Sequence, residues 1–213
     1  MAANLGLLLL PLALSGKLMS GLSDASSVVL LLGASIFCGC DLSAALYARQ
    51  RETRRATRLD ERARMLAAAT GISVLLIFWT ALLSRARSPV LIDPLAVFAG
   101  ALFLVGGTGL RFAAIHTLGP AFATEVSVRP DQSLVLEGVY RYMRHPSETG
   151  LLLVTLGAVV LAGGVATLAV WCSLLIPLVA LRIRLEERCL HAAFGRRYDR
   201  YAHRVRRLIP FVC

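Results

Sequence analysis

Residues 138–164 read GVYRYMRHPSETGLLLVTLGAVVLAGG, a polar and basic segment followed at once by an apolar run that ends in two glycines. Proline suits the first turn of a helix, because its missing N–H would have no partner there. The segment therefore predicts a loop that enters an apolar helix at Pro146. Polar groups beside an apolar medium are costly unless they bind something, so this junction is the first candidate for a functional site.

The composition of the chain predicts a membrane protein. Its 213 residues are 57% hydrophobic and 17% charged, and the mean hydropathy is +0.69. Soluble domains are about half apolar and about a quarter charged. The net charge of +10 comes largely from arginines grouped beside apolar runs, which is typical of cytoplasmic membrane flanks and not of a nucleic-acid-binding domain. The cysteines and histidines show no metal-ligand spacing, so we expect no metal site.

Successive apolar runs predict an all-α integral membrane fold with about five to six transmembrane helices. The runs have about the length of roughly 20 residues that crosses a bilayer. The last run, 149–181, is divided by Gly163-Gly164 into a helical hairpin with a short first arm, and a charged helical tail follows. The glycines at 106, 107 and 109 predict close helix contact in the span before the hairpin. The spans predicted before the hairpin are about 3–20, 27–47, 66–83 and 95–115.

The arginine-rich block 49–64 sets the predicted orientation. If it lies in the cytoplasm, as the distribution of positive charge favours, residues 116–146 and the basic C-terminal helix lie there too. A composite site at the cytoplasmic face is therefore expected. We divide the chain into an N-terminal scaffold, 1–104, and a site-bearing region, 105–213. The small size and the Ala/Arg-rich composition suggest a bacterial inner membrane.

Several charged residues admit both a structural and a functional interpretation. Arg182 and Glu186 share a helix face, so they form either an intrahelical ion pair or a pair of ligand-binding groups at the membrane interface. Glu187 lies on another face and is expected to meet water or the basic tail. His145 either binds a ligand or ties the loop. Arg111 lies inside an apolar span, where a charge is costly. Its side chain is therefore expected to reach the cytoplasmic interface, to bind an anionic headgroup, or to pair with an acid such as Glu125.

The motif at 138–147, followed by Arg182, Glu186-Glu187 and Phe194-Gly195, resembles the isoprenylcysteine carboxyl methyltransferase family and the related phospholipid N-methyltransferases. The resemblance covers about residues 105–211. It implies an all-helical membrane enzyme that uses S-adenosyl-L-methionine, with a cofactor pocket built by the loop before the hairpin and by the C-terminal segment. The cofactor-binding positions that it implies are Glu125, Gln132, Ser133, Leu134, Val135, Tyr140, His145, Pro146, Ser147, Glu148 and Glu186.

The resemblance also implies catalytic positions and reveals one departure. Arg182 matches the substrate-contacting arginine of the family, and Glu186 would fix cofactor or substrate. After His-Pro-x the family usually has an aromatic residue, whereas this chain has Glu148. A carboxylate there can answer a positive group of the cofactor, accept a proton from the acceptor, or repel an anionic acceptor. Arg182, Glu186 and Glu148 are therefore the predicted catalytic residues.

The sequence thus predicts a membrane methyltransferase acting on a lipophilic acceptor, either an isoprenylcysteine-type carboxylate or a lipid amine. Two rivals stay open. One is a membrane sterol or enone reductase using NADPH, which has a similar Arg-His-Pro loop. The other is a non-catalytic lipid-binding protein on the same scaffold. Membrane lipids are expected partners, and nucleic acid is not.

Overall fold

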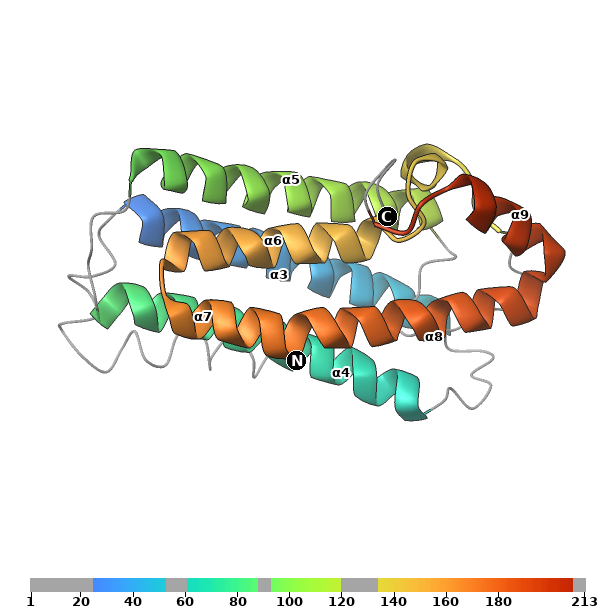
Figure 1. The fold of residues 1–213 in the computed structure, drawn as a ribbon, viewed down its shortest axis with the longest axis horizontal. Coiled ribbons are helices and arrows are strands. Elements are labelled where there is room, and N and C mark those ends of the chain that lie inside the picture. The colour runs from blue at the N-terminus through green and yellow to red at the C-terminus, as the bar shows by residue number, and fades with distance from the viewer. Residues whose placement is uncertain (1–24, 53–60, 88–92, 120–133, 209–213) are drawn as a thin grey trace.

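The computed structural model describes residues 25–52, 61–87, 93–119 and 134–208, and within these ranges every regular element is a helix (Figure 1). The predicted all-α fold is therefore confirmed for this part of the chain. The helices are α3 (Ala25–Glu52), α4 (Glu61–Arg87), α5 (Pro94–Leu118), η2 (Gly138–Arg141), α6 (Pro146–Ala162), α7 (Val165–Val170), η3 (Trp171–Leu175), α8 (Ile176–Phe194) and α9 (Arg196–Arg204). A single parallel bridge between Met143 and Arg206 is the one β-type pairing in these ranges.

Four of these helical stretches are long and apolar enough to cross a membrane: Ser26–Ser43, Met65–Ala86, Pro94–Leu118 and Val165–Phe194. Much of their apolar surface is exposed; for example, Phe98 and Val105 are 67% and 72% exposed. In water such faces would be unfavourable, whereas in a bilayer they meet lipid. Helix α6 is apolar but has only 17 residues. The predicted span 3–20 lies outside the described residues.

The predicted hairpin is present, and its first arm is the short one. Helix α6 ends at Gly163, whose φ of 61° is left-handed and suits glycine. The second arm runs without interruption from Val165 to Phe194, so the part of the tail from Arg182 to Phe194 continues a membrane helix. A π turn at Trp171–Leu175 precedes Pro177, which lacks the N–H for a regular helical bond. Trp171 Nε1 donates to Thr155 Oγ1 at 3.0 Å and joins the two arms.

Glycines allow α5 and α6 to approach until their backbones touch. A Cβ added at Gly107 would lie 2.7 Å from the Gly150 carbonyl oxygen, and one at Gly157 would lie 2.7 Å from the Gly100 carbonyl oxygen. A Cβ added at Gly106 would meet nothing within 4 Å. The predicted close contact is thus made by Gly107, which faces α6. The same prediction is wrong for Gly106 and Gly109 within the described part of the chain, because a Cβ added at either would meet no atom of that part within 4 Å.

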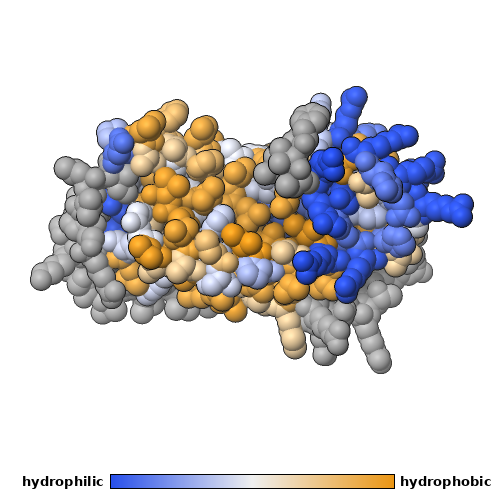
Figure 2. All heavy atoms as spheres, in the orientation of Figure 1, coloured by the Kyte–Doolittle hydropathy of each residue, from blue (hydrophilic) through white to orange (hydrophobic). Residues whose placement is uncertain are grey.

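The polar ends of the helices gather at one end of the bundle. Figure 1 places there the C-terminal ends of α3 and α5, the N-terminal ends of α4 and α6, and all of α9. In Figure 2 hydrophilic side chains crowd this end, while hydrophobic ones cover the middle of the molecule. The loop before the hairpin and the C-terminal segment therefore meet at the same end, which is the arrangement that the arginine pattern predicted.

Candidate functional site

The loop before α6 is held by the C-terminal segment through backbone hydrogen bonds. The Arg144 N–H donates to the Arg206 carbonyl at 2.8 Å, and the His145 N–H donates to the Arg207 carbonyl at 3.0 Å. Thr149 Oγ1 donates to the carbonyls of both His145 and Leu208, at 3.0 and 3.1 Å. The first turn of α6 and the chain end are thus one unit, although 59 residues separate Thr149 from Leu208.

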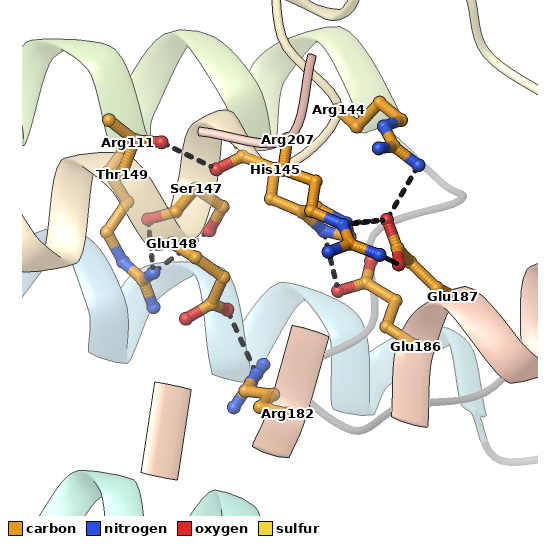
Figure 3. A network of polar contacts seen from close by, with 10 residues as sticks. All are labelled: Arg111, Arg144, His145, Ser147, Glu148, Thr149, Arg182, Glu186, Glu187 and Arg207. Carbon is orange, nitrogen blue, oxygen red and sulfur yellow. Dashed lines mark hydrogen bonds and ion pairs between the residues drawn. The ribbon is translucent and has the colours of Figure 1, made fainter. Parts of the chain in front are cut away.

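A cluster of ten polar side chains lies where this unit meets α5 and α8 (Figure 3). Five of its members are acids or hydroxyl-bearing residues from the two arms of the hairpin, and five are basic. We call it the polar cluster; its members are Arg111, Arg144, His145, Ser147, Glu148, Thr149, Arg182, Glu186, Glu187 and Arg207.

Glu187 is the hub of one half of the polar cluster. Its Oε1 lies 2.7 Å from Arg144 Nη1, and its two oxygens accept from Arg207 Nη2 and Nε at 2.8 and 3.1 Å. His145 Nε2 lies 3.5 Å from the same Oε1. The contact with the basic tail was expected from the sequence. The contacts with Arg144 and His145 were missed, because only the folded loop brings these side chains to the face of Glu187.

His145 is buried, with 3% of its surface exposed, between two carboxylates from α8. Its Nδ1 lies 3.3 Å from Glu186 Oε2, and its Nε2 faces Glu187. Burial alone would lower the pKa of the imidazole, but the bonds to Glu186 and Glu187 outweigh burial and raise the pKa of His145 to about 9. The side chain is therefore an imidazolium at neutral pH, and it ties the loop to α8.

Arg182 and Glu148 form a second buried ion pair, between α8 and α6. Arg182 Nε lies 2.9 Å from Glu148 Oε1, and the two side chains are 13% and 4% exposed. Arg182 and Glu186 share a helix face, as the sequence predicted, and each also reaches a group outside α8. Arg182 turns to Glu148, and Glu186 turns to His145 (Figure 3). The other Glu148 oxygen, Oε2, is buried and accepts no hydrogen bond from any described residue.

Arg111 joins the N-terminal half of the chain to the site. Its guanidinium forms a bidentate pair with Asp41 of α3, with Nε and Nη2 at 2.5 and 3.0 Å from the carboxylate oxygens. Its Nη1 also donates to the carbonyl and the hydroxyl of Ser147, at 3.1 and 2.9 Å. The sequence named Glu125 as a candidate partner; the acid that Arg111 meets is Asp41, and Glu125 lies outside the described residues. The signal was present in the sequence, since Asp41 is a lone acid in an apolar run.

Tyrosines close the site on the α9 side. The Tyr201 hydroxyl donates to the Tyr140 carbonyl at 2.6 Å, and Tyr198 packs edge-on against Tyr201. Tyr140 and Tyr198 are 8% and 4% exposed, and burial raises the pKa of each phenol. These phenols are therefore neutral, and their rings serve as packing groups. The contact fixes α9 against the 3-10 turn that carries Tyr140.

The structure brings most of the predicted site residues to one place. Tyr140, the residues from His145 to Glu148, Arg182 and Glu186 all lie at the polar end, and Leu134 and Val135 are half-buried in the segment that leads there. The predicted positions Glu125, Gln132 and Ser133 lie outside the described residues. The residues of the polar cluster and its surroundings that the sequence did not assign to the site are Asp41, Arg111, Arg144, Thr149, Glu187 and Arg207.

Comparison with known proteins agrees with this geometry. Residues 100–192 match the model of the isoprenylcysteine carboxyl methyltransferase (ICMT) family. Protein-S-isoprenylcysteine O-methyltransferase B of Arabidopsis thaliana is 36% identical over 115 residues, which are 53% of this chain and 58% of that protein. The Schizosaccharomyces pombe protein-S-isoprenylcysteine O-methyltransferase is 33% identical over 52% of this chain and 48% of its own length. The chain thus spans about half the length of the curated relatives that it matches.

The fold of most of the chain also has a counterpart. The solved structure of the eukaryotic intramembrane Ras methyltransferase ICMT matches with a TM-score of 0.58 and 22% identity, over 92% of this chain and 73% of that one. At this identity the match speaks for the fold, and it includes the N-terminal helices that the family match omits. Together with the four apolar spans, it shows an integral multi-pass membrane protein. The resemblance carried by the Arg-His-Pro motif is confirmed, because residues 100–192 match the isoprenylcysteine carboxyl methyltransferase family and the fold is similar to that of a solved methyltransferase of that name.

Proposed function

We propose that this protein is an S-adenosyl-L-methionine-dependent methyltransferase that acts on a lipophilic acceptor, an isoprenylcysteine-type carboxylate or a lipid amine. The observation that carries the proposal is the polar cluster at the end of an apolar bundle, because all of its members except Arg207 lie inside the region that matches the methyltransferase family. A polar cofactor and a lipid-soluble acceptor can meet at such a junction. The arginine distribution supports a cytoplasmic site, and composition favours a bacterial inner membrane.

The residues present suit a cationic, zwitterionic cofactor. Glu186 keeps 38% of its side chain exposed although one oxygen contacts His145, whereas Glu187 is only 14% exposed and engaged by three cations. Glu186 is therefore the carboxylate that a ligand can reach, and Glu187 serves the architecture. Tyr140 offers a buried aromatic ring nearby. Residues 134–136 lie outside regular helices, so their backbone groups can bond to the cofactor.

When bound, S-adenosyl-L-methionine would supply a methyl group activated by its sulfonium; the acceptor would bond to the methyl carbon in line as the carbon–sulfur bond breaks and S-adenosyl-homocysteine leaves. The protein's task is then chiefly to align and desolvate the two partners. In our proposal Glu186 and the backbone of the loop from His145 to Glu148 hold the cofactor, and Arg182 lies beside the acceptor. Glu148 is the candidate base for an oxygen or nitrogen acceptor that carries a proton. His145, fixed by Glu187, keeps the loop against α8.

Calorimetry on the detergent-solubilised protein tests the proposal. We expect S-adenosyl-homocysteine to bind, and Glu186→Gln to weaken its binding at least tenfold. Arg188→Gln, an exposed change on the same helix, is the matched control and should bind like wild type. Binding of NADPH in place of S-adenosyl-homocysteine would support the reductase alternative instead. Binding of lipid alone, with neither cofactor, would indicate the non-catalytic alternative.

A further inference from the structure

We infer that Glu148 selects the acceptor, and that this chain favours a lipophilic amine over a lipophilic carboxylate. The inference rests on the proposed function, because it places the acceptor beside Arg182. It goes further by naming the chemical group of the acceptor and the residue that chooses it. Two features of the Glu148 carboxylate support the inference: Oε1 contacts Arg182, and Oε2 is buried without a hydrogen-bond donor in the described part of the chain.

The used oxygen neutralises the cation that an anionic acceptor would need. Glu148 Oε1 lies 2.9 Å from Arg182 Nε, and the side chains are 4% and 13% exposed. In this buried environment of low dielectric constant, the attraction within the pair and the repulsion of a second carboxylate are both stronger than in water. The fold holds the Glu148 carboxylate next to Arg182. A carboxylate acceptor would therefore have to displace Glu148 from Arg182, or lie beside the negative charge of Glu148. The pair therefore disfavours anionic acceptors.

The second oxygen of Glu148, Oε2, lacks a hydrogen-bond donor among the described residues. Glu148 Oε2 is buried, and across the described ranges no group donates a hydrogen bond to it. A carboxylate oxygen buried without a donor is costly, so a ligand that brings an N–H gains from satisfying it. A charge-assisted bond from an ammonium is stronger than a neutral one. A carboxylate acceptor offers no proton to this oxygen, whereas an amine does.

Nearby cations are already engaged elsewhere. Arg111 pairs with Asp41 and donates to Ser147, and Arg144 and Arg207 both pair with Glu187. His145 sits between Glu186 and Glu187. Arg111, Arg144, His145 and Arg207 thus each contact an acid other than Glu148. The additional donor for Glu148 is expected to come from a ligand.

The same N–H chemistry has two sources, the acceptor amine and the amino group of the cofactor, and binding measurements separate them. We suggest two probes that share one isoprenyl thioether tail and end in either a primary amine or a carboxylate. Each is titrated into the detergent-solubilised wild type, into Glu148→Gln, and into the exposed control Arg184→Gln, with and without S-adenosyl-homocysteine. Affinity is the readout, so the result does not depend on turnover.

We expect wild type and Arg184→Gln to bind the amine probe at least tenfold more tightly than the carboxylate probe. Glu148→Gln keeps the shape but removes the charge, so it should lose this preference or reverse it while S-adenosyl-homocysteine still binds. Equal affinities in wild type, or a preference for the carboxylate, would overturn the inference even if Glu148→Gln does not fold. A Glu148→Gln variant that loses S-adenosyl-homocysteine but keeps amine selectivity would also overturn it, assigning Glu148 to the cofactor. Failure of the proposed function would show differently, as no binding of S-adenosyl-homocysteine to wild type.

Discussion

The contact between α5 and α6 predicts a sharp difference between two adjacent glycines. At Gly107 an added Cβ would lie 2.7 Å from the Gly150 carbonyl oxygen, 2.7 Å from the Val154 nitrogen and 2.9 Å from Leu153 Cβ. Two of these atoms belong to the α6 backbone, so no side-chain rotation can relieve the contact. The helices must separate by several tenths of an ångström. At Gly106 the same Cβ would meet nothing within 4 Å.

The expected magnitudes follow from these distances. Overpacking a tight interface costs about 1–3 kcal/mol, whereas Gly→Ala at an open helical position gains up to about 1 kcal/mol from propensity. Both variants gain the propensity contribution, so the difference between them is the overpacking cost alone, and Gly107→Ala should be less stable than Gly106→Ala by about 2 kcal/mol. For a chain of this size that difference corresponds to roughly 4–8 °C in Tm.

Thermal unfolding in one detergent, followed by loss of helical circular dichroism, measures the contrast. Gly106→Ala should melt at or slightly above wild type, and Gly107→Ala well below both. The contact also sets the distance between Arg111 and the start of α6, because a Cβ at Gly150 would lie 2.9 Å from the Arg111 backbone nitrogen. Equal melting temperatures for the two variants would refute the idea that bare backbone contact joins α5 to α6.

Three further predictions concern the polar cluster. The pKa of His145 is raised to about 9, so its protonation stabilises the folded protein by at most about 3 kcal/mol. This contribution is fully present below about pH 6.5 and is lost as the pH rises through about 9. In thermal melts between about pH 6 and 10, His145→Gln should show a smaller loss of stability with rising pH than wild type. Glu187→Gln leaves three cations without their full counter-charge and should destabilise the folded protein by about 3 kcal/mol. The exposed control Arg188→Gln should not. Equal melting temperatures for the two variants would mean that Glu187 does not hold these cations together. Asp41→Asn leaves the Arg111 charge without a full counter-charge and should lower stability by about 2 kcal/mol. It should also weaken S-adenosyl-homocysteine binding. Unchanged affinity would show that α3 does not influence cofactor binding.

The sequence predicted the parts of the fold that follow from local patterns. Apolar length predicted the spans, and Gly163-Gly164 predicted the hairpin turn, because a left-handed residue ends a helix wherever it occurs. It did not predict that the second arm continues past Arg182 to Phe194. Arginine can remain in a membrane helix when a buried acid neutralises it, and that acid, Glu148, is 34 residues away in the chain.

Pairings across long sequence separations explain what was missed in the site. The motif identified His145, Glu186 and Arg182, yet Arg182 and Glu186 turn to different partners although they share a helix face. The clamp of Arg207 on Glu187 depends on the chain end returning to the loop, which no periodicity encodes.

The central claim, methyl transfer at the polar cluster, has a direct test. Membranes that contain the protein would be incubated with methyl-labelled S-adenosyl-L-methionine and a crude lipid extract, and the products separated and weighed by mass spectrometry. The account predicts a labelled lipophilic product with wild type and with Arg188→Gln, and at least a tenfold lower yield with Glu186→Gln. Equal label in the wild-type and Glu186→Gln samples, or label in neither while S-adenosyl-homocysteine fails to bind, would contradict it.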